Sequence, residues 1–201
     1  RRLMSDMGLK VTIYSKHTAK YHSYKGAVGN IAPNILKQQF GAKQPLTVLH
    51  TDVTQIKLYN GEWGYISSIT DEASREVLAA IVSASPNKAL IQATLDELQH
   101  HLKAGVRPIL HSDQGWQYQM PDYQQRLKDM NIVQSMSRKA TCLDNAAMES
   151  FFHILKAEVY DQKQFDTLAE LTQAVANWIQ YYNFTRIKTK LGGKSPVKYR
   201  V

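Results

Sequence analysis

Three acidic residues occupy positions from which they could bind metal together. Asp52 and Asp113 each follow an apolar, strand-like run, and Glu149 lies 36 positions after Asp113 in a segment with helical spacing. Phosphodiester chemistry requires that transition-state charge be offset and that the attacking and leaving oxygens be aligned, which two Mg²⁺ ions about 4 Å apart accomplish. Mg²⁺ prefers carboxylate oxygens and water. We predict that Asp52 bridges two Mg²⁺ ions, for which Mn²⁺ can substitute, while Asp113 and Glu149 each bind one.

The spacing of these acids is weak evidence by itself, because a chain with 17 Asp and Glu residues contains many such sets by chance. The segments between them add support, since they indicate an α/β domain. Alternating strand and helix signals in the order β-β-β-α-β-α-β-α predict a mixed five-stranded sheet flanked by helices, with the fourth strand parallel beside the first. That pairing would bring Asp113 close to Asp52. The predicted strands cover residues 47–56, 62–69, 76–83, 107–111 and 132–135, and the predicted helices cover residues 87–102 and 122–130.

The helix that carries Glu149 is expected to lie on the sheet. At about 100° per residue, four apolar side chains share the sector that should face the core. These are Met148, Phe152, Leu155 and Val159. Asn145, Glu149 and Lys156 fall along a stripe at the edge of that sector, so Lys156 could hold a phosphate that approaches the metal. Asp144 is expected to cap the start of the helix.

Charge is distributed unevenly along the chain. The formal net charge of +8 divides into +7 for residues 1–45, −5 for residues 46–182 and +6 for residues 183–201. Basic flanks around an acidic middle predict that the ends contact a polyanion while the middle carries carboxylates for metal. Each flank alone could be ordinary solvated surface. The two together, with Tyr14, Tyr21 and Tyr24 interleaved in the first, favour nucleic acid.

Length and composition predict one well-buried domain with extensions, or at most two small domains. We expect a basic N-terminal arm over residues 1–45, a catalytic core over residues 46–165, and a C-terminal helix with a basic tail over residues 166–201. No apolar run approaches the roughly 20 residues of a membrane span, so no membrane partner is expected. The lone Cys142 cannot form an internal disulfide, which favours the cytoplasm.

Several segments resemble the transposases of bacterial insertion sequences of the IS3 type, IS150-like members of the retroviral-integrase-like DDE group. The resemblance covers essentially the whole chain. It is carried chiefly by Thr51-Asp52-Val53-Thr54, by residues 111–118, by Ser137-Arg138-Lys139, by residues 142–152 and by the tail at residues 191–196. It implies an RNase H-like fold, Mg²⁺ dependence and a catalytic triad at Asp52, Asp113 and Glu149. It also implies that Lys156 is the basic residue that the family carries seven positions after the glutamate.

The resemblance further implies that the partners are DNA, namely the terminal inverted repeats of the element and the target DNA. A homodimer or larger synaptic complex, associated with the bacterial nucleoid, is expected because two DNA ends must be joined. Residues expected to contact DNA are Arg138, Lys139, Lys156, Arg186, Lys188, Lys190 and Lys194. Trp178, Tyr181 and Tyr182 are expected to serve core or subunit packing rather than base stacking. His111 is expected to pack or hydrogen-bond rather than to bind metal.

Three functions remain open on the sequence. An active transposase would hydrolyse a phosphodiester to expose a 3′-OH, which then attacks a second phosphodiester. A DNA-binding protein derived from a transposase would do neither, although the intact triad argues against it. A nuclease of the same fold would cleave DNA without joining it, so joined products distinguish the first function from the third.

Overall fold

A single mixed sheet of five strands forms the centre of the molecule. The computed structural model describes residues 6–8, 29–103, 105–138, 145–161 and 163–201. In the order β3-β2-β1-β4-β5, the first three strands are antiparallel neighbours, whereas β4 runs parallel to β1 and β5 runs parallel to β4. The strands are β1 (Val48–Lys57), β2 (Trp63–Asp71), β3 (Val77–Ser83), β4 (Ile109–Ser112) and β5 (Val133–Met136).

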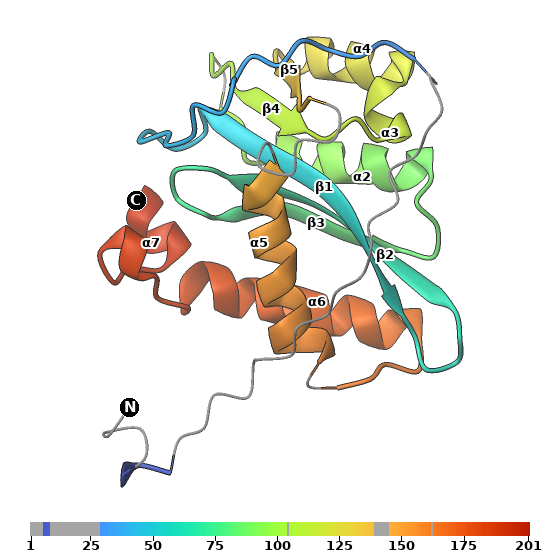
Figure 1. Cartoon of the computed structure of the whole chain (residues 1–201), viewed down its shortest axis with the longest axis vertical. Coiled ribbons are helices and arrows are strands. Elements are labelled where there is room, and N and C mark those ends of the chain that lie inside the picture. The colour runs from blue at the N-terminus through green and yellow to red at the C-terminus, as the bar shows by residue number, and fades with distance from the viewer. Residues whose placement is uncertain (1–5, 9–28, 104, 139–144, 162) are drawn as a thin grey trace.

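Helices cover both faces of this sheet (Figure 1). They are α2 (Lys88–Gln99), α3 (Trp116–Gln119), α4 (Pro121–Asp129), α5 (Ala146–Leu155), α6 (Leu168–Phe184) and α7 (Pro196–Arg200). Leu49 and Leu110 belong to the apolar cluster that packs against α2, α3 and α4, while Ile56 belongs to the cluster that packs against α5 and α6. Because alternate residues of a strand share a face, His50, Asp52 and Ile56 all lie on the α5 side of β1.

The α5 helix packs on β1 through a predominantly apolar face. Met148 and Leu155 are fully buried, and Phe151 and Phe152 are nearly so. A π-helical turn, Lys156–Tyr160, continues α5 directly. In Figure 1, α5 starts beside β1 and ends beside α6. The N-cap position of α5 is Asn145, whereas Asp144, which we expected to cap the helix, lies outside the described residues.

The fold predicted from the sequence is confirmed in its strand order and in the parallel pairing of β4 with β1. All five strands lie within one or two residues of the predicted ranges. Four elements of the described residues were not predicted: the four-residue α3, the π-helical turn after α5, the 3₁₀ turn Thr189–Leu191 and the five-residue α7, which begins at Pro196 where we expected the helical region to have ended. A single short turn has no periodicity to detect, and a widened helical turn has no signature in residue type.

The segment after residue 165 packs against the sheet rather than standing apart. Leu171, Val175 and Trp178 of α6 share one apolar cluster with Ile56 and Ile66 of the sheet. The division at residues 46 and 166 into arm, core and tail therefore stays a prediction. Among the described residues, no helix is long and apolar enough to cross a membrane.

Candidate active site

The parallel pairing of β1 with β4 positions two of the predicted carboxylates. His50 of β1 lies opposite His111 of β4 in the register of the two strands. Asp52 follows His50 by two residues, and Asp113 follows His111 by two residues. The two acids therefore lie at matching positions on neighbouring segments, and neighbouring strands of a sheet are about 4.8 Å apart. Since residues two apart along a strand share a face, Asp52 is directed, like His50, to the side that α5 covers, while Asp113 directly follows the end of β4.

The first residues of α5 contact Asp52 directly. The Nδ2 of Asn145 donates a hydrogen bond of 2.9 Å to Oδ2 of Asp52, and the backbone N–H of Val53 donates one of 2.7 Å to Oδ1. Asn145 is almost fully buried. Glu149 lies one helical turn after Asn145 and is exposed. The start of α5 thus holds Asp52 in one orientation and carries Glu149 to the same edge of the sheet.

Electrostatic repulsion links the three acids. Burial first, and then the negative charges of Asp113 and Glu149, raise the pKa of Asp52 from 3.8 to about 7 against the opposing hydrogen bonds from Val53 and Asn145. Asp113 accepts a hydrogen bond of 2.8 Å from the backbone N–H of Gly115. The structure therefore brings Asp113 and Glu149 each within electrostatic range of Asp52.

This donor set has the chemistry of a divalent-cation site. Carboxylate oxygens that repel one another are stabilised when a cation with oxygen preference lies between them. Among the described residues, no group of three or more His, Cys, Asp or Glu side chains stands close enough together to hold a metal ion as the side chains are placed. The exposed Glu149 is the member with room to turn toward the other two. The residues present fit Mg²⁺ in identity and charge.

Lys156 extends the site beyond the carboxylates. It begins the π-helical turn after α5 and is half-buried. Burial lowers the pKa of Lys156, while the negative charges of Asp161 and Asp52 oppose that shift. Because the charge of Asp52 affects the pKa of Lys156, the ammonium group of Lys156 lies within electrostatic range of that carboxylate. This agrees with the predicted position of Lys156 on the same stripe of the helix as Glu149.

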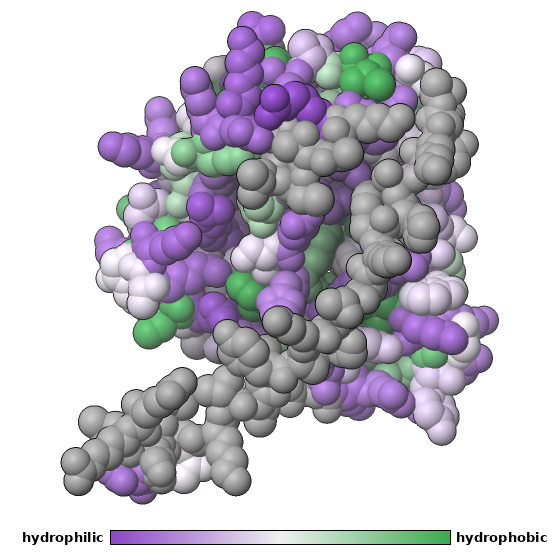
Figure 2. Space-filling view, viewed as in Figure 1, coloured by the Kyte–Doolittle hydropathy of each residue, from purple (hydrophilic) through white to green (hydrophobic). Residues whose placement is uncertain are grey.

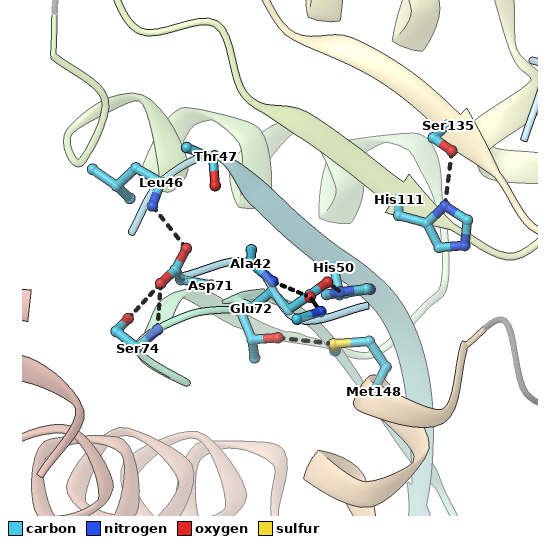
Figure 3. A network of polar contacts seen from close by, with 12 residues as sticks. Ala42, Leu46, Thr47, His50, Asp71, Glu72, Ser74, His111, Ser135 and Met148 are labelled. Carbon is cyan, nitrogen blue, oxygen red and sulfur yellow. Dashed lines mark hydrogen bonds and ion pairs between the residues drawn. The ribbon is translucent and has the colours of Figure 1, made fainter. Parts of the chain in front are cut away.

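A buried polar network supports β1 just before Asp52 (Figure 3). The Nε2 of His50 donates to Oε2 of Glu72 at 2.7 Å, and both side chains are almost completely inaccessible. Glu72 also accepts from the backbone N–H groups of Gly41 and Ala42. Burial disfavours ionisation of Glu72, but the hydrogen bond from His50, those from the two N–H groups and the charge of His50 together lower its pKa to about 2. The network holds the segment before β1 against the sheet.

The ring of His50 also contacts His111 across β1 and β4, with ring centroids 5.8 Å apart. The Nδ1 of His111 bonds the hydroxyl of Ser135 on β5 at 2.9 Å, as Figure 3 shows. The expected packing and hydrogen-bonding role of His111 is thereby confirmed.

The basic residues expected to contact DNA fall into two regions. Arg138 is exposed and directly precedes the undescribed residues 139–144, which include Lys139. In the tail, Lys188 and Lys194 are joined through their backbones in a tight turn, where Gly192 and Gly193 have positive φ angles of 63° and 76°. Lys190 and Lys194 are exposed. Arg186 instead donates to Glu158, with Nη2 and Oε1 2.7 Å apart, so its contact with DNA stays a prediction.

Two of the three aromatic residues of α6 are in the core. Trp178 and Tyr182 are buried with ring centroids 4.8 Å apart, as predicted, whereas Tyr181 is 47% exposed and does not belong to the core.

The family to which the chain belongs follows from its likeness to known proteins. Two models described as an integrase core domain match residues 42–142 and residues 149–201. An uncharacterized transposase-like protein of Haemophilus influenzae is 46% identical over 200 residues, which are 100% of this chain and 90% of that protein. The putative transposase InsK for insertion sequence IS150 of Escherichia coli is 43% identical over 100% of this chain and 69% of its own length. The chain belongs to the IS3 family of insertion-sequence transposases.

The fold of this transposase is also found in retroviral integrases. A chain in the structure of a simian T-cell lymphotropic virus intasome matches 89% of the transposase with a TM-score of 0.67 and 16% identity, and the transposase spans 59% of that chain. The HTLV-2 integrase catalytic core domain, solved in complex with magnesium, matches 79% of the transposase with a TM-score of 0.62 and 16% identity. The transposase spans 98% of that core-domain chain. At this identity the likeness shows the fold alone, which is RNase H-like.

Sequence reasoning about this transposase did not find two features of the site. Asn145 was placed on the stripe with Glu149 but was given no contact with Asp52, although its place one turn before Glu149 was the available signal. The His50–Glu72 pair joins residues of β1 and of the turn after β2, and no spacing in the sequence indicates that contact.

Proposed function

We propose that this transposase cleaves DNA and transfers DNA strands in Mg²⁺-dependent reactions, with Asp52, Asp113 and Glu149 as its catalytic metal ligands. The observation that carries the proposal is the place of Asp52: its buried carboxylate on β1 is hydrogen-bonded by Asn145 at the start of α5 and lies in electrostatic range of Asp113, just after β4, and of Glu149 on α5. Three acids brought to one place without a compensating cation make a fold less stable, so such an arrangement indicates a binding site for cations.

Each residue has a distinct part in the proposed chemistry. When bound, Mg²⁺ supplies an activated nucleophile and offsets the charge that develops on the phosphodiester. Asp52, which lies in electrostatic range of both other acids, would hold Mg²⁺ together with them, and Asn145 keeps the carboxylate of Asp52 in place. Lys156 binds the phosphate of the approaching strand.

The reaction has two chemical steps that use the same residues. Water attacks a phosphodiester at the end of the element, and the 3′ oxygen leaves with a proton as a free 3′-OH. That hydroxyl then attacks a phosphodiester of another DNA segment, which forms a new P–O bond and releases the 3′-OH of the segment attacked. No covalent link between protein and DNA is needed, so no Ser, Cys or Tyr nucleophile is required.

The proposed partners are the inverted repeats of the element and a target DNA, held by a homodimer or larger assembly. Support comes from the basic tail around Lys188, Lys190 and Lys194 and from exposed Arg138. Lys139, Lys156 and Arg186 complete the proposed set of DNA contacts. Such contacts are largely to phosphate, so we expect the affinity for DNA to fall steeply with salt concentration.

A strand-transfer assay tests this function. Labelled oligonucleotides that carry the ends of the insertion sequence are incubated with the chain, Mg²⁺ and a supercoiled target plasmid, and the products are separated by length. We expect shortened and joined products from the wild type and neither from Asp113→Asn, while Asp129→Asn on the exposed end of α4 matches the wild type. Cleavage without joining would identify a nuclease. DNA binding without either product would identify a DNA-binding protein derived from a transposase.

A further inference from the structure

A row of buried polar residues crosses the sheet directly before the proposed metal ligands. His50 of β1 lies opposite His111 of β4, and His111 lies opposite Ser135 of β5. All three residues are completely buried. Asp52 follows His50 by two residues and Asp113 follows His111 by two, a step of about 7 Å along an extended chain. Each proposed catalytic aspartate is thus preceded, two residues earlier, by a buried histidine.

The members of this row contact one another. The rings of His50 and His111 meet edge to face with centroids 5.8 Å apart, and Nδ1 of His111 bonds the hydroxyl of Ser135 at 2.9 Å (Figure 3). On the other side of the row, Nε2 of His50 donates to Oε2 of Glu72 at 2.7 Å. Buried polar groups cost free energy unless they are hydrogen-bonded, and hydrogen bonds between them fix side-chain positions more narrowly than apolar packing does. The row is therefore suited to fix how β1 and β4 lie relative to each other.

The segment that precedes β1, residues 29–46, is fastened to one end of this row. This segment, the linker, joins the N-terminal residues to the sheet. The backbone N–H of Ile35 donates to Oγ of Ser135 at 3.0 Å. One hydroxyl group therefore bonds both the linker and His111.

The linker is also fastened to the other end of the row. The ring of Phe40 lies against that of His50, with centroids 6.0 Å apart. The backbone N–H groups of Gly41 and Ala42 both donate to Oε1 of Glu72, whose other carboxylate oxygen accepts from His50. One short stretch of the linker therefore reaches both histidines, one through a shared hydroxyl and the other through a ring and a carboxylate.

We propose that the two histidines are positioning residues for the metal site and that the linker, by holding both, sets the separation of Asp52 and Asp113. The proposal rests on the proposed function, since it assumes that these two carboxylates bind metal together. Metal ligands must be held to within about 0.5 Å of the productive geometry. Residues that orient metal ligands usually account for about 10- to 100-fold in metal affinity. A linker that leaves the sheet would therefore lower the affinity for divalent cations although it contributes no ligand.

Direct titration with Mn²⁺ tests the proposal, with Ile35→Pro as the main variant. Free Mn²⁺ is measured by electron paramagnetic resonance in solutions of the full chain without DNA. Proline removes the N–H that bonds Ser135, and it is favoured directly after a residue such as Asn34, whose side chain caps a turn by accepting from the N–H of Lys37. We expect Ile35→Pro to weaken Mn²⁺ binding about tenfold. Ile35→Ala, which keeps the N–H, should bind Mn²⁺ as the wild type does.

Variants elsewhere in the network give independent measurements. His111→Leu should weaken Mn²⁺ binding about tenfold or more, and His111→Asn should restore most of the affinity, because its amide can bond Ser135 in place of Nδ1. Phe40→Ala, at a position 43% exposed on the linker, should weaken binding in the same direction. Thr94→Val is the control, since it removes a buried hydrogen bond to the carbonyl of Leu90 on α2, beyond the opposite face of the sheet. It should leave the affinity for Mn²⁺ unchanged.

Melting temperatures measured without metal separate positioning from lost stability. We expect weakened Mn²⁺ binding at temperatures at which every variant is folded, and we expect the strand-transfer activity of Ile35→Pro to return at high Mg²⁺ concentration. If Ile35→Pro or His111→Leu fails to fold, Phe40→Ala decides. Unchanged Mn²⁺ affinity in the folded variants would overturn the positioning role and leave the proposed function standing.

Two further outcomes concern the wild type. Mn²⁺ binding that depends on the linker, in a wild type that neither cleaves nor joins DNA, would keep the positioning role and overturn the proposed function. Mn²⁺ binding that is the same in the wild type and in Asp52→Asn would overturn both.

Discussion

The side-chain amide of Asn145 is hydrogen-bonded to the carboxylate of Asp52 at 2.9 Å, which joins the start of α5 to the middle of β1. The bond fixes the orientation of the carboxylate and offsets part of the repulsion that Asp52 experiences from Asp113 and Glu149. A residue that orients a metal ligand usually accounts for about 10- to 100-fold in metal affinity or activity.

We therefore expect Asn145→Ala to lower strand-transfer activity about tenfold or more and to raise the Mg²⁺ concentration needed for half-maximal activity. Titration of activity with Mg²⁺ measures both quantities. Asn145→Asp should be more damaging, because it adds a third negative charge beside Asp52, after those of Asp113 and Glu149. An unchanged Mg²⁺ requirement in Asn145→Ala would remove Asn145 from the site.

The raised pKa of Asp52 predicts that its ionisation destabilises the metal-free chain. The folded chain holds the proton up to about pH 7, whereas an ordinary aspartic acid loses it near pH 3.8, so stability falls as the pH rises through this window. Without metal, Asp52→Asn should therefore melt at a higher temperature than the wild type at pH 8, and the difference should shrink toward pH 4. Asp129→Asn is the control, and its melting temperature should follow that of the wild type at both pH values.

The Glu72–His50 pair predicts the opposite dependence on pH. The folded pKa of Glu72 is about 2 against an ordinary 4.5, so its contribution is complete above pH 4.5 and is lost as the pH falls toward 2. Glu72→Gln should lower the free energy of unfolding in urea at pH 7, and its deficit relative to the wild type should disappear near pH 2. A deficit that stays constant with pH would mean that Glu72 acts through packing alone.

Lys156 is expected to bind phosphate beside the carboxylates. Lys156→Ala should weaken DNA binding and should reduce the dependence of log Kd on log salt concentration by about one phosphate contact. Lys163→Ala, which removes an exposed lysine nearby, is the control and should leave both the affinity and the salt dependence unchanged. Equal effects of the two substitutions would indicate that Lys156 contributes only general positive charge.

The sheet was predictable from sequence because the signals for its first two strands and for the turn between them lie in neighbouring residues. Val48 to Lys57 and Trp63 to Asp71 are rich in residues that favour strands and are separated by the turn at Asn60-Gly61, so their pairing follows from the chain itself. The parallel pairing of β4 with β1 was predictable from the order of elements, since few topologies accommodate a strand after a helix in a mixed sheet. The approach of Asp113 to Asp52 then followed.

The contacts around the triad depend on residues that are far apart in sequence. Asn145 is 93 positions from Asp52, and Glu72 is 22 positions from His50. Their meeting depends on how α5 and the turn after β2 pack on the sheet. The charge of the tail was predictable, but the pairing of Arg186 with Glu158 and the crowding of Arg75 with Lys188 were not, because the π-helical turn and the left-handed Arg75 have no sequence signature.

Anomalous X-ray diffraction from crystals soaked in Mn²⁺ tests most directly whether positions 52, 113 and 149 form one cation site. We expect an anomalous peak between the carboxylates of Asp52 and Asp113, with Glu149 turned toward it, and no such peak in crystals of Asp52→Asn. Manganese bound at a different place in the wild type, with these carboxylates left uncoordinated, would contradict the account.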